Sequence, residues 1–143
     1  MARPPTCLYA GERLEPRTIG PITQTDIVRF AGAGGDFNPL HHDPEYAQRA
    51  GLPGVIAMGQ MQAGMLAAWV SDLAHVEHLL SYSVRFAAPL YLGDTLELSG
   101  HVESVEAGIA ALTLRASAGE RVVISGTARV RVAELAIAES GLT

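Results

Sequence analysis

A change in the spacing of apolar residues divides this chain and limits the folds open to it. Between Gly59 and Leu73 nearly every helical face is apolar, and small residues such as Ala63 and Gly64 allow close packing. A helix of this kind is buried within its protein. From Leu79 onward the apolar residues instead recur at every second position, which is typical of antiparallel strands with one face on a core. The sequence therefore predicts a buried helix followed by a sheet.

The second half of the chain is predicted to form four strands, near residues 80–88, 95–106, 109–117 and 121–133. Glycine-containing turns separate them, and the connections after the second strand are short. Neighbouring strands in this part should therefore pair as hairpins. A further short edge strand is expected at residues 18–22, where Pro21 limits its pairing.

The simplest way to bury both elements is to wrap the twisted sheet around the helix, which is the α+β arrangement called the hot-dog fold. At 143 residues the chain is most simply one such domain, residues 1–143, with residues 1–17 as an irregular N-terminal arm. An edge strand on so small a sheet needs a cover. Edge-to-edge pairing in a twofold dimer supplies one, so we expect a homodimer.

Two shorter helices are predicted before the buried one. Thr23 and Asp26 have the spacing of a capping box, which opens a helix that ends at a glycine-rich run. Asp43 is well placed as an N-cap before the short helix Pro44–Ala50, whose first position holds the proline. Between the two helices lies a segment that its glycines and a proline keep from being helical.

This segment, Gly35–His41, carries a carboxylate, an amide and an imidazole. Asp36 and His41, held on one rigid turn, could bind a water between them and move two protons, which is the chemistry needed to add water to an activated double bond. In the alternative, Asp36 and Asn38 only satisfy a turn, and His41 lies at the surface. The segment alone leaves both hypotheses open.

The charge of the chain argues against nucleic-acid binding. Its formal net charge is −5, and its ten cationic residues are arginines scattered along the sequence, whereas a phosphate-binding surface needs clustered cations. Cys7 is the only cysteine, so no intrachain disulfide and no thiolate metal site are expected. No apolar stretch is long enough to span a membrane, and residues 1–5 do not resemble a secretory signal, so a cytoplasmic protein is expected.

Over about residues 23–132 the chain resembles the MaoC-like branch of the hot-dog superfamily, the (R)-specific enoyl-CoA hydratases. The most specific element is Gly35-Asp36-Phe37-Asn38-Pro39-Leu40-His41, and Val84-Arg85-Phe86 with Gly93-Asp94 supports it. The resemblance implies a hydratase or dehydratase, a lyase that acts on an enoyl thioester of CoA or of an acyl carrier protein in fatty acid metabolism. It implies no metal and no redox cofactor.

The resemblance also assigns roles. It makes Asp36 and His41 the catalytic pair, it makes Asn38 a support of the site, and it directs the thioester oxygen to the backbone N–H of Gly59. We favour His41 as the base toward water and Asp36, partly desolvated, as the proton donor to C2, although the opposite division is also compatible with the sequence. Delivery of both components from one face means syn addition and, by analogy with the family, an (R)-3-hydroxyacyl product. The reverse reaction is a dehydration.

Two positions depart from the family pattern. Met58 stands where a histidine is common, and Ala67 stands where some members have a serine. We interpret both as changes in pocket shape and substrate preference. Met58 and Met61, at the start of the buried helix, are the apolar residues that we expect to touch an acyl chain.

Other polar residues are expected to be structural. His75 and His78 have no third ligand in sight, so we expect a solvated helix end rather than a metal site. Arg85 could contact a CoA phosphate or an interface carboxylate, but a structural ion pair is favoured. His42 and His101 are expected at the surface.

Two rival functions remain open at this stage. A hot-dog thioesterase usually carries a carboxylate on the buried helix, and residues 59–71 contain none. A non-catalytic acyl-thioester-binding subunit, paired with a related chain in a heteromeric dehydratase, would explain the missing histidine and serine. Assembly beyond a dimer, and the type of acyl group, cannot be deduced from these residues.

Overall fold

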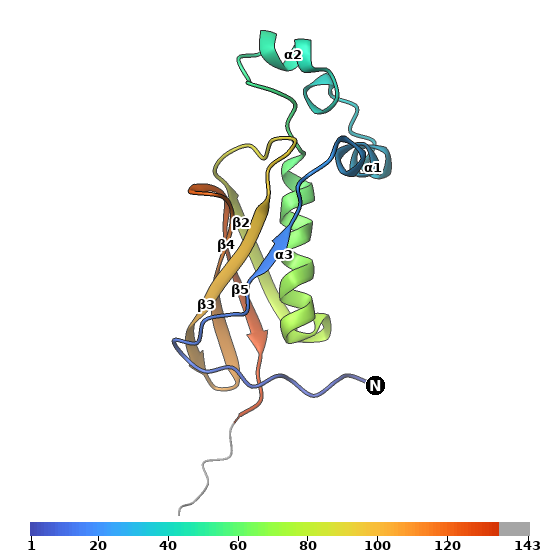
Figure 1. Cartoon of the computed structure of the whole chain (residues 1–143). Coiled ribbons are helices and arrows are strands. Elements are labelled where there is room, and N and C mark those ends of the chain that lie inside the picture. The colour runs from blue at the N-terminus through green and yellow to red at the C-terminus, as the bar shows by residue number, and fades with distance from the viewer. Residues whose placement is uncertain (135–143) are drawn as a thin grey trace, which may run out of the picture.

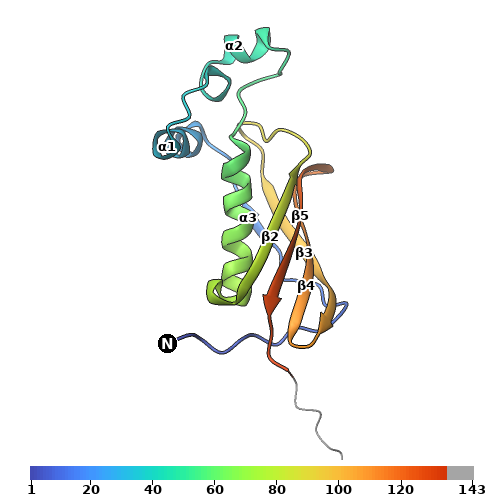
Figure 2. The same cartoon turned by 180° about the vertical axis from the view of Figure 1, so that it is seen from behind.

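In the computed structural model, residues 1–134 are described, and the predicted domain end at residues 135–143 lies outside them. The chain forms an antiparallel sheet with one long helix packed along a single face (Figures 1 and 2). The elements in chain order are β1 (Arg17–Ile19), α1 (Gln24–Gly34), η1 (Pro39–His41), α2 (Pro44–Arg49), α3 (Gly59–Ala74), η2 (Val76–His78), β2 (Leu79–Phe86), β3 (Leu96–Glu106), β4 (Ile109–Ala118) and β5 (Arg121–Arg131). The predicted α+β hot-dog arrangement is confirmed.

The five strands follow the order β1-β3-β4-β5-β2, and every neighbouring pair is antiparallel. The two predicted hairpins, β3 with β4 and β4 with β5, are confirmed. Strand β2, which follows the long helix, pairs with the last strand instead of with β3. Strands β1 and β2 therefore form the two edges of the sheet.

The expected edge strand at residues 18–22 is shorter and begins one residue earlier, since β1 ends at Ile19. Gly20 has φ 124°, and Pro21 has no N–H with which to continue the ladder. The irregular arm before β1 is nevertheless tied to the sheet. Leu14, which is buried, donates its N–H to Gly100 in β3 at 2.9 Å.

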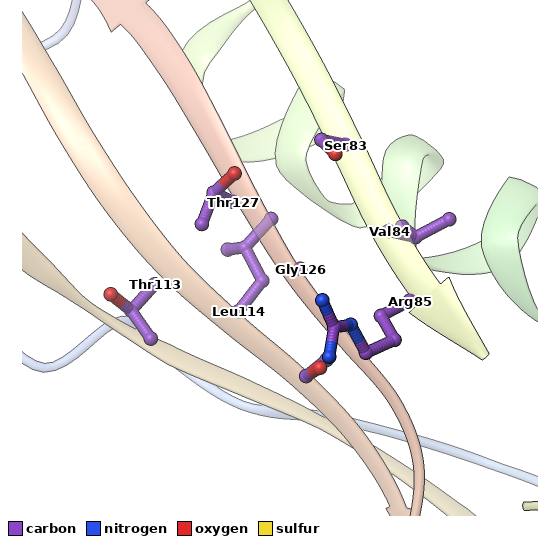
Figure 3. Close-up of a pocket in the computed structure, with 8 residues that line it drawn as sticks. Ser83, Val84, Arg85, Thr113, Leu114, Gly126 and Thr127 are labelled. Carbon is purple, nitrogen blue, oxygen red and sulfur yellow. The ribbon is translucent and has the colours of Figure 1, made fainter. Parts of the chain in front are cut away.

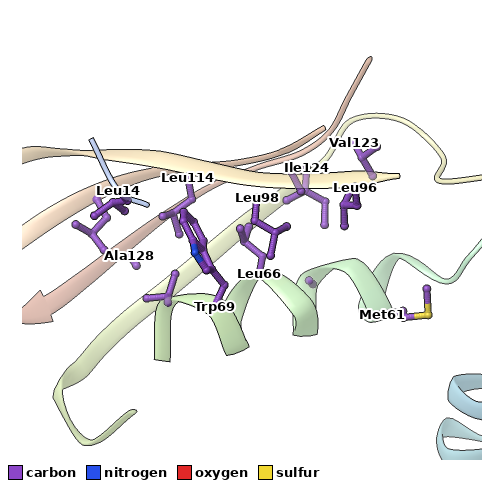
Figure 4. Close-up of a cluster of buried hydrophobic side chains, with 14 of the residues drawn as sticks. Leu14, Met61, Leu66, Trp69, Leu96, Leu98, Leu114, Val123, Ile124 and Ala128 are labelled. Carbon is purple, nitrogen blue, oxygen red and sulfur yellow. The ribbon is translucent and has the colours of Figure 1, made fainter. Parts of the chain in front are cut away.

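Helix α3 buries the side that faces the strands. Leu66 and Trp69 project from it toward Leu98 and Leu114 of the sheet (Figure 4). The expectation that the helix is buried all round is wrong for the single chain, because the sheet covers one side only. The far side exposes a stripe of residues one turn apart, namely Gln60, Gly64, Ala68 and Asp72.

Helices α1 and α2 lie beyond the sheet, at the N-terminal end of α3 (Figures 1 and 2). The predicted capping box is confirmed: Thr23 accepts the N–H of Asp26 at 3.1 Å, and the Asp26 carboxylate accepts the N–H of Thr23 at 2.9 Å. Asp43 caps α2, as predicted, by accepting the N–H groups of Glu45 and Tyr46. These caps satisfy the first N–H groups of the two helices.

The C-terminal end of α3 is more enclosed than expected. His78 is buried, and its Nε2–H donates to the carbonyl oxygen of Arg3 at 2.6 Å. Arg3 also pairs with Glu77 at 2.7 Å, which holds the pKa of this carboxyl well below its usual range. The predicted solvated helix end is therefore wrong for His78, because the N-terminal arm covers it. Within residues 1–134, no helix is long and apolar enough to cross a membrane.

Tyr82 provides a test of how the sheet holds α3. Its hydroxyl donates to the Ala63 carbonyl oxygen at 2.7 Å, and burial raises its pKa from 10.0 to about 12. We expect Tyr82→Phe to lower the free energy of unfolding by about 0.5–1.5 kcal/mol at pH 8. Because the folded protein holds this proton more tightly than the unfolded chain, the stabilisation is complete below pH 10 and is lost as the pH rises toward 12.

Urea unfolding of the wild type and of Tyr82→Phe, at pH 8 and at pH 11, checks this prediction. The other tyrosines are common to both proteins, so the difference between the two curves isolates Tyr82. A difference that stays the same at the two pH values contradicts it.

Candidate active site

The loop after α1 positions Asp36 through its own turn. Gly35 ends the helix with φ 71°, a left-handed conformation that glycine adopts without strain. Asp36 Oδ1 then accepts the N–H of Asn38 at 3.2 Å, and the Asn38 side chain accepts a further N–H two residues on, at 3.0 Å. The satisfied turn that we weighed as an alternative is thus present, but it uses only one carboxylate oxygen of Asp36.

The other carboxylate oxygen faces His41. Asp36 Oδ2 lies 3.3 Å from His41 Nε2. The His41 side chain is 10% exposed and that of Asp36 is 47% exposed, so the desolvation expected of Asp36 is not seen in the single chain. The structure brings these two residues together, and the surface position of His41 required by the turn-only alternative is wrong.

A buried hydrogen bond fixes the tautomer of His41. Its Nδ1 lies 2.7 Å from the backbone carbonyl oxygen of Ile56. Since a carbonyl can only accept, Nδ1 carries a proton, and Nε2 keeps its lone pair in the neutral ring. Nε2 and a carboxylate oxygen are both acceptors, so their contact is favourable when one proton lies between them. The pair can therefore hold one transferable proton.

The same loop is fastened on both sides. Ile56 donates its N–H to the Leu40 carbonyl oxygen at 3.0 Å, and the Gln24 side chain of α1 donates to the His41 carbonyl oxygen at 2.9 Å. The loop is thus held between α1 and the segment that leads into α3 at Gly59. The sequence did not indicate that Ile56 holds the loop, because its backbone carbonyl and N–H make these hydrogen bonds and its side chain does not.

The start of α3 differs from the starts of α1 and α2. Its N-cap, Met58, makes no side-chain hydrogen bond, whereas Thr23 and Asp43 cap their helices. The first N–H groups of a helix have no partner within it, and the helix dipole adds positive potential at this end. An uncapped helix start is therefore suited to bind the oxygen of a polarised carbonyl.

Gly59, the first residue of α3, lies against the ring of Phe86 in β2. A Cβ added at Gly59 would come within 2.9 Å of Phe86 Cε1. One reason for a glycine here is that a side chain would obstruct the approach of a carbonyl to this N–H. The structure adds a second reason, which is the close packing of an aromatic ring that is itself 51% exposed.

The two methionines expected to touch an acyl chain belong to the hydrophobic core. Met58 and Met61 are each 4% exposed, and Met61 points from the start of α3 away from the strands (Figure 4). Neither lines the pocket that lies beside His41, so their contact with a substrate stays a prediction. Ala67, which stands in place of a serine, is half-buried on α3.

Arg85 lies on the opposite face of the sheet from α3. It lines a hollow of about 390 Å³ together with Ser83, Thr113 and Thr127 (Figure 3). This hollow contains neither Asp36 nor His41. The ion pair favoured for Arg85 is not found within residues 1–134, where its guanidinium is exposed.

Two further histidines, His42 and His101, were predicted to lie at the surface. His42 and His101 are exposed, as expected, and His101 contacts the Glu103 carboxylate at 2.7 Å. Within the described part of the chain, no cluster of three or more His, Cys, Asp or Glu side chains could hold a metal ion.

One feature of the site was missed by our sequence reasoning. A pocket of about 250 Å³ lies beside His41 and is lined by apolar groups of α1 and of the loop: Ile27, Val28, Ala31, Gly32 and Phe37, with His42 at its rim. The apolar positions of α1 were a usable signal, but our sequence analysis drew no pocket from them.

The sequence and the fold of this chain resemble those of known proteins. Residues 9–122 match the family model described as MaoC like domain. The 3-hydroxybutyryl-CoA dehydratase of Methylorubrum extorquens is 32% identical over 115 residues, which cover 78% of this chain and 73% of that protein. The 3-hydroxyacyl-thioester dehydratase X of Mycobacterium tuberculosis is 40% identical over 83 residues, or 58% of this chain.

The chain spans only part of the length of some relatives. It covers 29% of dehydratase X. It covers 58% of the mitochondrial 3-hydroxyacyl-[acyl-carrier-protein] dehydratase of Arabidopsis thaliana, and the two are 31% identical over 70% of the present chain.

Solved structures share the fold of this chain. The unliganded R-hydratase PhaJ1 of Pseudomonas aeruginosa superimposes with a TM-score of 0.76 at 26% identity, covering 90% of this chain and 88% of that one. The ChsH1-ChsH2 complex of M. tuberculosis gives 0.77 at 24% identity, covering 87% and 98%. On the family match and these likenesses together, the chain belongs to the MaoC-like domain family.

Proposed function

We propose that this protein is a hydratase or dehydratase that interconverts a trans-2-enoyl thioester and a 3-hydroxyacyl thioester. The observation that carries the proposal is the 3.3 Å contact between His41 Nε2 and Asp36 Oδ2. The loop that holds this pair is hydrogen-bonded to the segment that leads into α3, whose start has no side-chain cap. Two relatives that match most of this chain support it: the 3-hydroxybutyryl-CoA dehydratase and the (R)-specific enoyl-CoA hydratase of Rhodospirillum rubrum, which is 31% identical over 78% of this chain.

In the proposed hydration, water attacks C3 while His41 Nε2 takes a proton from it. The negative charge that develops on the thioester oxygen is stabilised by the N–H groups at the start of α3, including that of Gly59. Asp36 gives the proton held by the pair to C2. The proton from water replaces it, so the pair ends with the one proton with which it began. Because both groups approach from one face, the addition is syn and the product is the (R)-3-hydroxyacyl thioester.

We also propose that the functional unit pairs two chains through strand β2. This strand forms one edge of the sheet, and it carries two exposed apolar side chains, Leu80 and Phe86. An open edge of this kind is a ready surface for strand pairing. The occupant is a second copy of this chain; the alternative is a related subunit in a heteromeric enzyme. Light scattering of the purified chain, with a dimer expected and a monomer contradicting it, tests this.

Replacement of the pair is the direct test of mechanism. We expect Asp36→Asn to lower kcat by about 10²–10⁴-fold, the usual contribution of a general acid or base. The fold should survive, because an amide oxygen at this position can still accept the N–H of Asn38. His41→Ala should have the same effect on kcat. The measurement is the rate at which the absorbance of crotonyl-CoA is lost.

The matched control is His101→Ala, which removes an exposed imidazole from β3. It should leave the rate unchanged. Circular dichroism and thermal unfolding of all three variants separate lost chemistry from lost fold. Near-normal turnover by a folded Asp36→Asn protein would refute the mechanism.

The thioesterase alternative predicts a different product. Thioester hydrolysis releases a free thiol, whereas hydration preserves the thioester bond. We expect the enoyl absorbance to disappear with no thiol detected by a disulfide reagent. Release of one thiol per thioester consumed, with no hydroxyacyl product, would replace our proposal with a hydrolase. Helix α3 carries no carboxylate before Asp72, and that residue pairs with Arg17 at 2.7 Å, which disfavours this outcome.

A further inference from the structure

Two hollows on the outer face of the sheet, the face turned away from α3, join into one groove. The first hollow, of about 390 Å³, is lined by Arg85 of β2. The second hollow, of about 620 Å³, is lined by Arg115 of β4. Residues common to both hollows are Thr113, Leu114 and Ser125. Since β4 and β5 lie between β2 and β3, the groove crosses four strands of the sheet.

The groove is basic although the chain is acidic. The formal net charge of the whole chain is −5. The arginine and carboxylate side chains that line the groove are nevertheless three arginines, Arg13, Arg85 and Arg115, and the single carboxylate of Glu97. A concave surface that gathers one sign of charge attracts ligands of the opposite sign. The groove is therefore suited to a small anion.

Two of these arginines flank one serine. In the register of the sheet, Ser125 of β5 lies opposite Arg115 of β4 on one side and opposite Arg85 of β2 on the other. Neighbouring strands are about 4.8 Å apart, so the backbones of the two arginines are about 10 Å apart. Arg85 extends its guanidinium from β2 toward β5 (Figure 3). Two side chains of this length can therefore contact one ligand above Ser125.

Among the described residues, neither of these two guanidinium groups has an acidic partner. Both side chains are exposed. By contrast, Arg3, Arg17 and Arg121 each pair with a carboxylate. An arginine has five N–H donors in a fixed planar arrangement, so the groove presents two such sets of donors with no carboxylate between them.

We infer that this groove binds a small molecule that carries a diphosphate group, such as a nucleoside diphosphate, at a site separate from the proposed catalytic pair. The planar fork of arginine matches two oxygens of a phosphate. Two forks on either side of Ser125 suit two adjacent phosphates. Hydroxyl groups along the groove supply further hydrogen bonds; they belong to Ser83, Ser99, Thr113, Ser125 and Thr127.

The compact shape of the basic area favours a small molecule over a nucleic acid. A nucleic acid needs cations spread along its backbone, whereas the acidic chain concentrates these arginines in one groove. His101, which also lines the groove, contacts the Glu103 carboxylate at 2.7 Å. The ligand is therefore expected at the β2 side of the groove, where Arg85 and Arg115 lie.

The groove lies on the other side of the sheet from the proposed chemistry. Phe86, the residue after Arg85, packs against Gly59 at the start of α3. Successive residues of a strand point to opposite faces, so Arg85 points away from α3. Neither Asp36 nor His41 lines either hollow. The inference therefore goes beyond the proposed function, and binding measurements test it whether or not the chain is a hydratase.

Calorimetry of the full chain with inorganic pyrophosphate, and with ADP, is the first test. We expect one site per chain, with binding that weakens as the salt concentration rises, because salt screens exposed charges. Arg85→Ala and Arg115→Ala should each weaken binding by about tenfold or more, as hydrogen bonds between charged groups are lost. Arg115→Lys should weaken it too, because an ammonium group lacks the planar fork.

Arg129→Ala is the matched control. Arg129 is an exposed arginine of β5, on the same face as Ser125, and it does not line the groove. This variant removes the same charge as Arg115→Ala, but it should change binding less than about twofold because salt screens a charge outside the site. The absence of pyrophosphate binding by the wild type overturns the inference. An equal loss of binding in Arg129→Ala and Arg115→Ala also overturns it.

The nucleotide end of a CoA thioester also carries a diphosphate, and kinetics separates this source from a free nucleotide. Crotonyl-pantetheine lacks the nucleotide and serves as the comparison substrate. For a separate site, Arg115→Ala should leave KM unchanged for both crotonyl-CoA and crotonyl-pantetheine. A KM that rises for crotonyl-CoA alone assigns the groove to the substrate and overturns the inference of a separate site. If the wild type hydrates neither substrate, the proposed function fails, and the calorimetric result still decides whether the groove binds diphosphate.

Discussion

The hydrogen bond between His41 Nδ1 and the Ile56 carbonyl oxygen, 2.7 Å long, is the contact on which the site depends. It fixes the tautomer of the neutral ring, because the carbonyl accepts the Nδ1–H and so leaves Nε2 with the lone pair. It also joins the loop to the segment that enters α3. The same hydrogen bond therefore fixes both the position of the His41 ring and its tautomer. A hydrogen bond at one ring nitrogen of a histidine commonly sets the role of the other nitrogen.

The three α-helices in the described part of the chain show where the fold leaves polar groups free. Thr23 and Asp43 satisfy the first N–H groups of α1 and α2. Met58 does not do so for α3. A capped start would compete with a bound oxygen for the same donors. The start of α3 thus has no side-chain cap, and it follows the segment to which the loop from α1 is hydrogen-bonded.

Local sequence signals predicted much of this structure. The alternation of apolar residues located β3, β4 and β5, and the Thr23–Asp26 spacing located the start of α1. Structural features that depend on contacts with distant segments could not be predicted from the local sequence. His78 is buried because Arg3, 75 residues away, lies over it. The far side of α3 is exposed because a sheet of this size covers one side of a helix.

The motif predicted which residues of the site come together, but not how they are held. Asp36 and His41 are five positions apart, so a turn can bring them into contact. The support from Ile56 comes from a backbone carbonyl, for which the side chain is no guide. The apolar pocket was missed for a similar reason: an apolar helix face has the same pattern whether it meets a core or an empty hollow.

The strand order has a consequence for synthesis on the ribosome. Strand β2 follows α3 after the short helix η2, yet its ladder partner is β5, which is made after β3 and β4. The apolar face of α3 and one edge of β2 therefore stay exposed to solvent while the β3–β4 hairpin is synthesised. Closure of the sheet is a late, long-range event, and such contacts are slow to form and leave the nascent chain open to aggregation until then. Within the described sheet, the nascent chain is thus most vulnerable just before β5 is released.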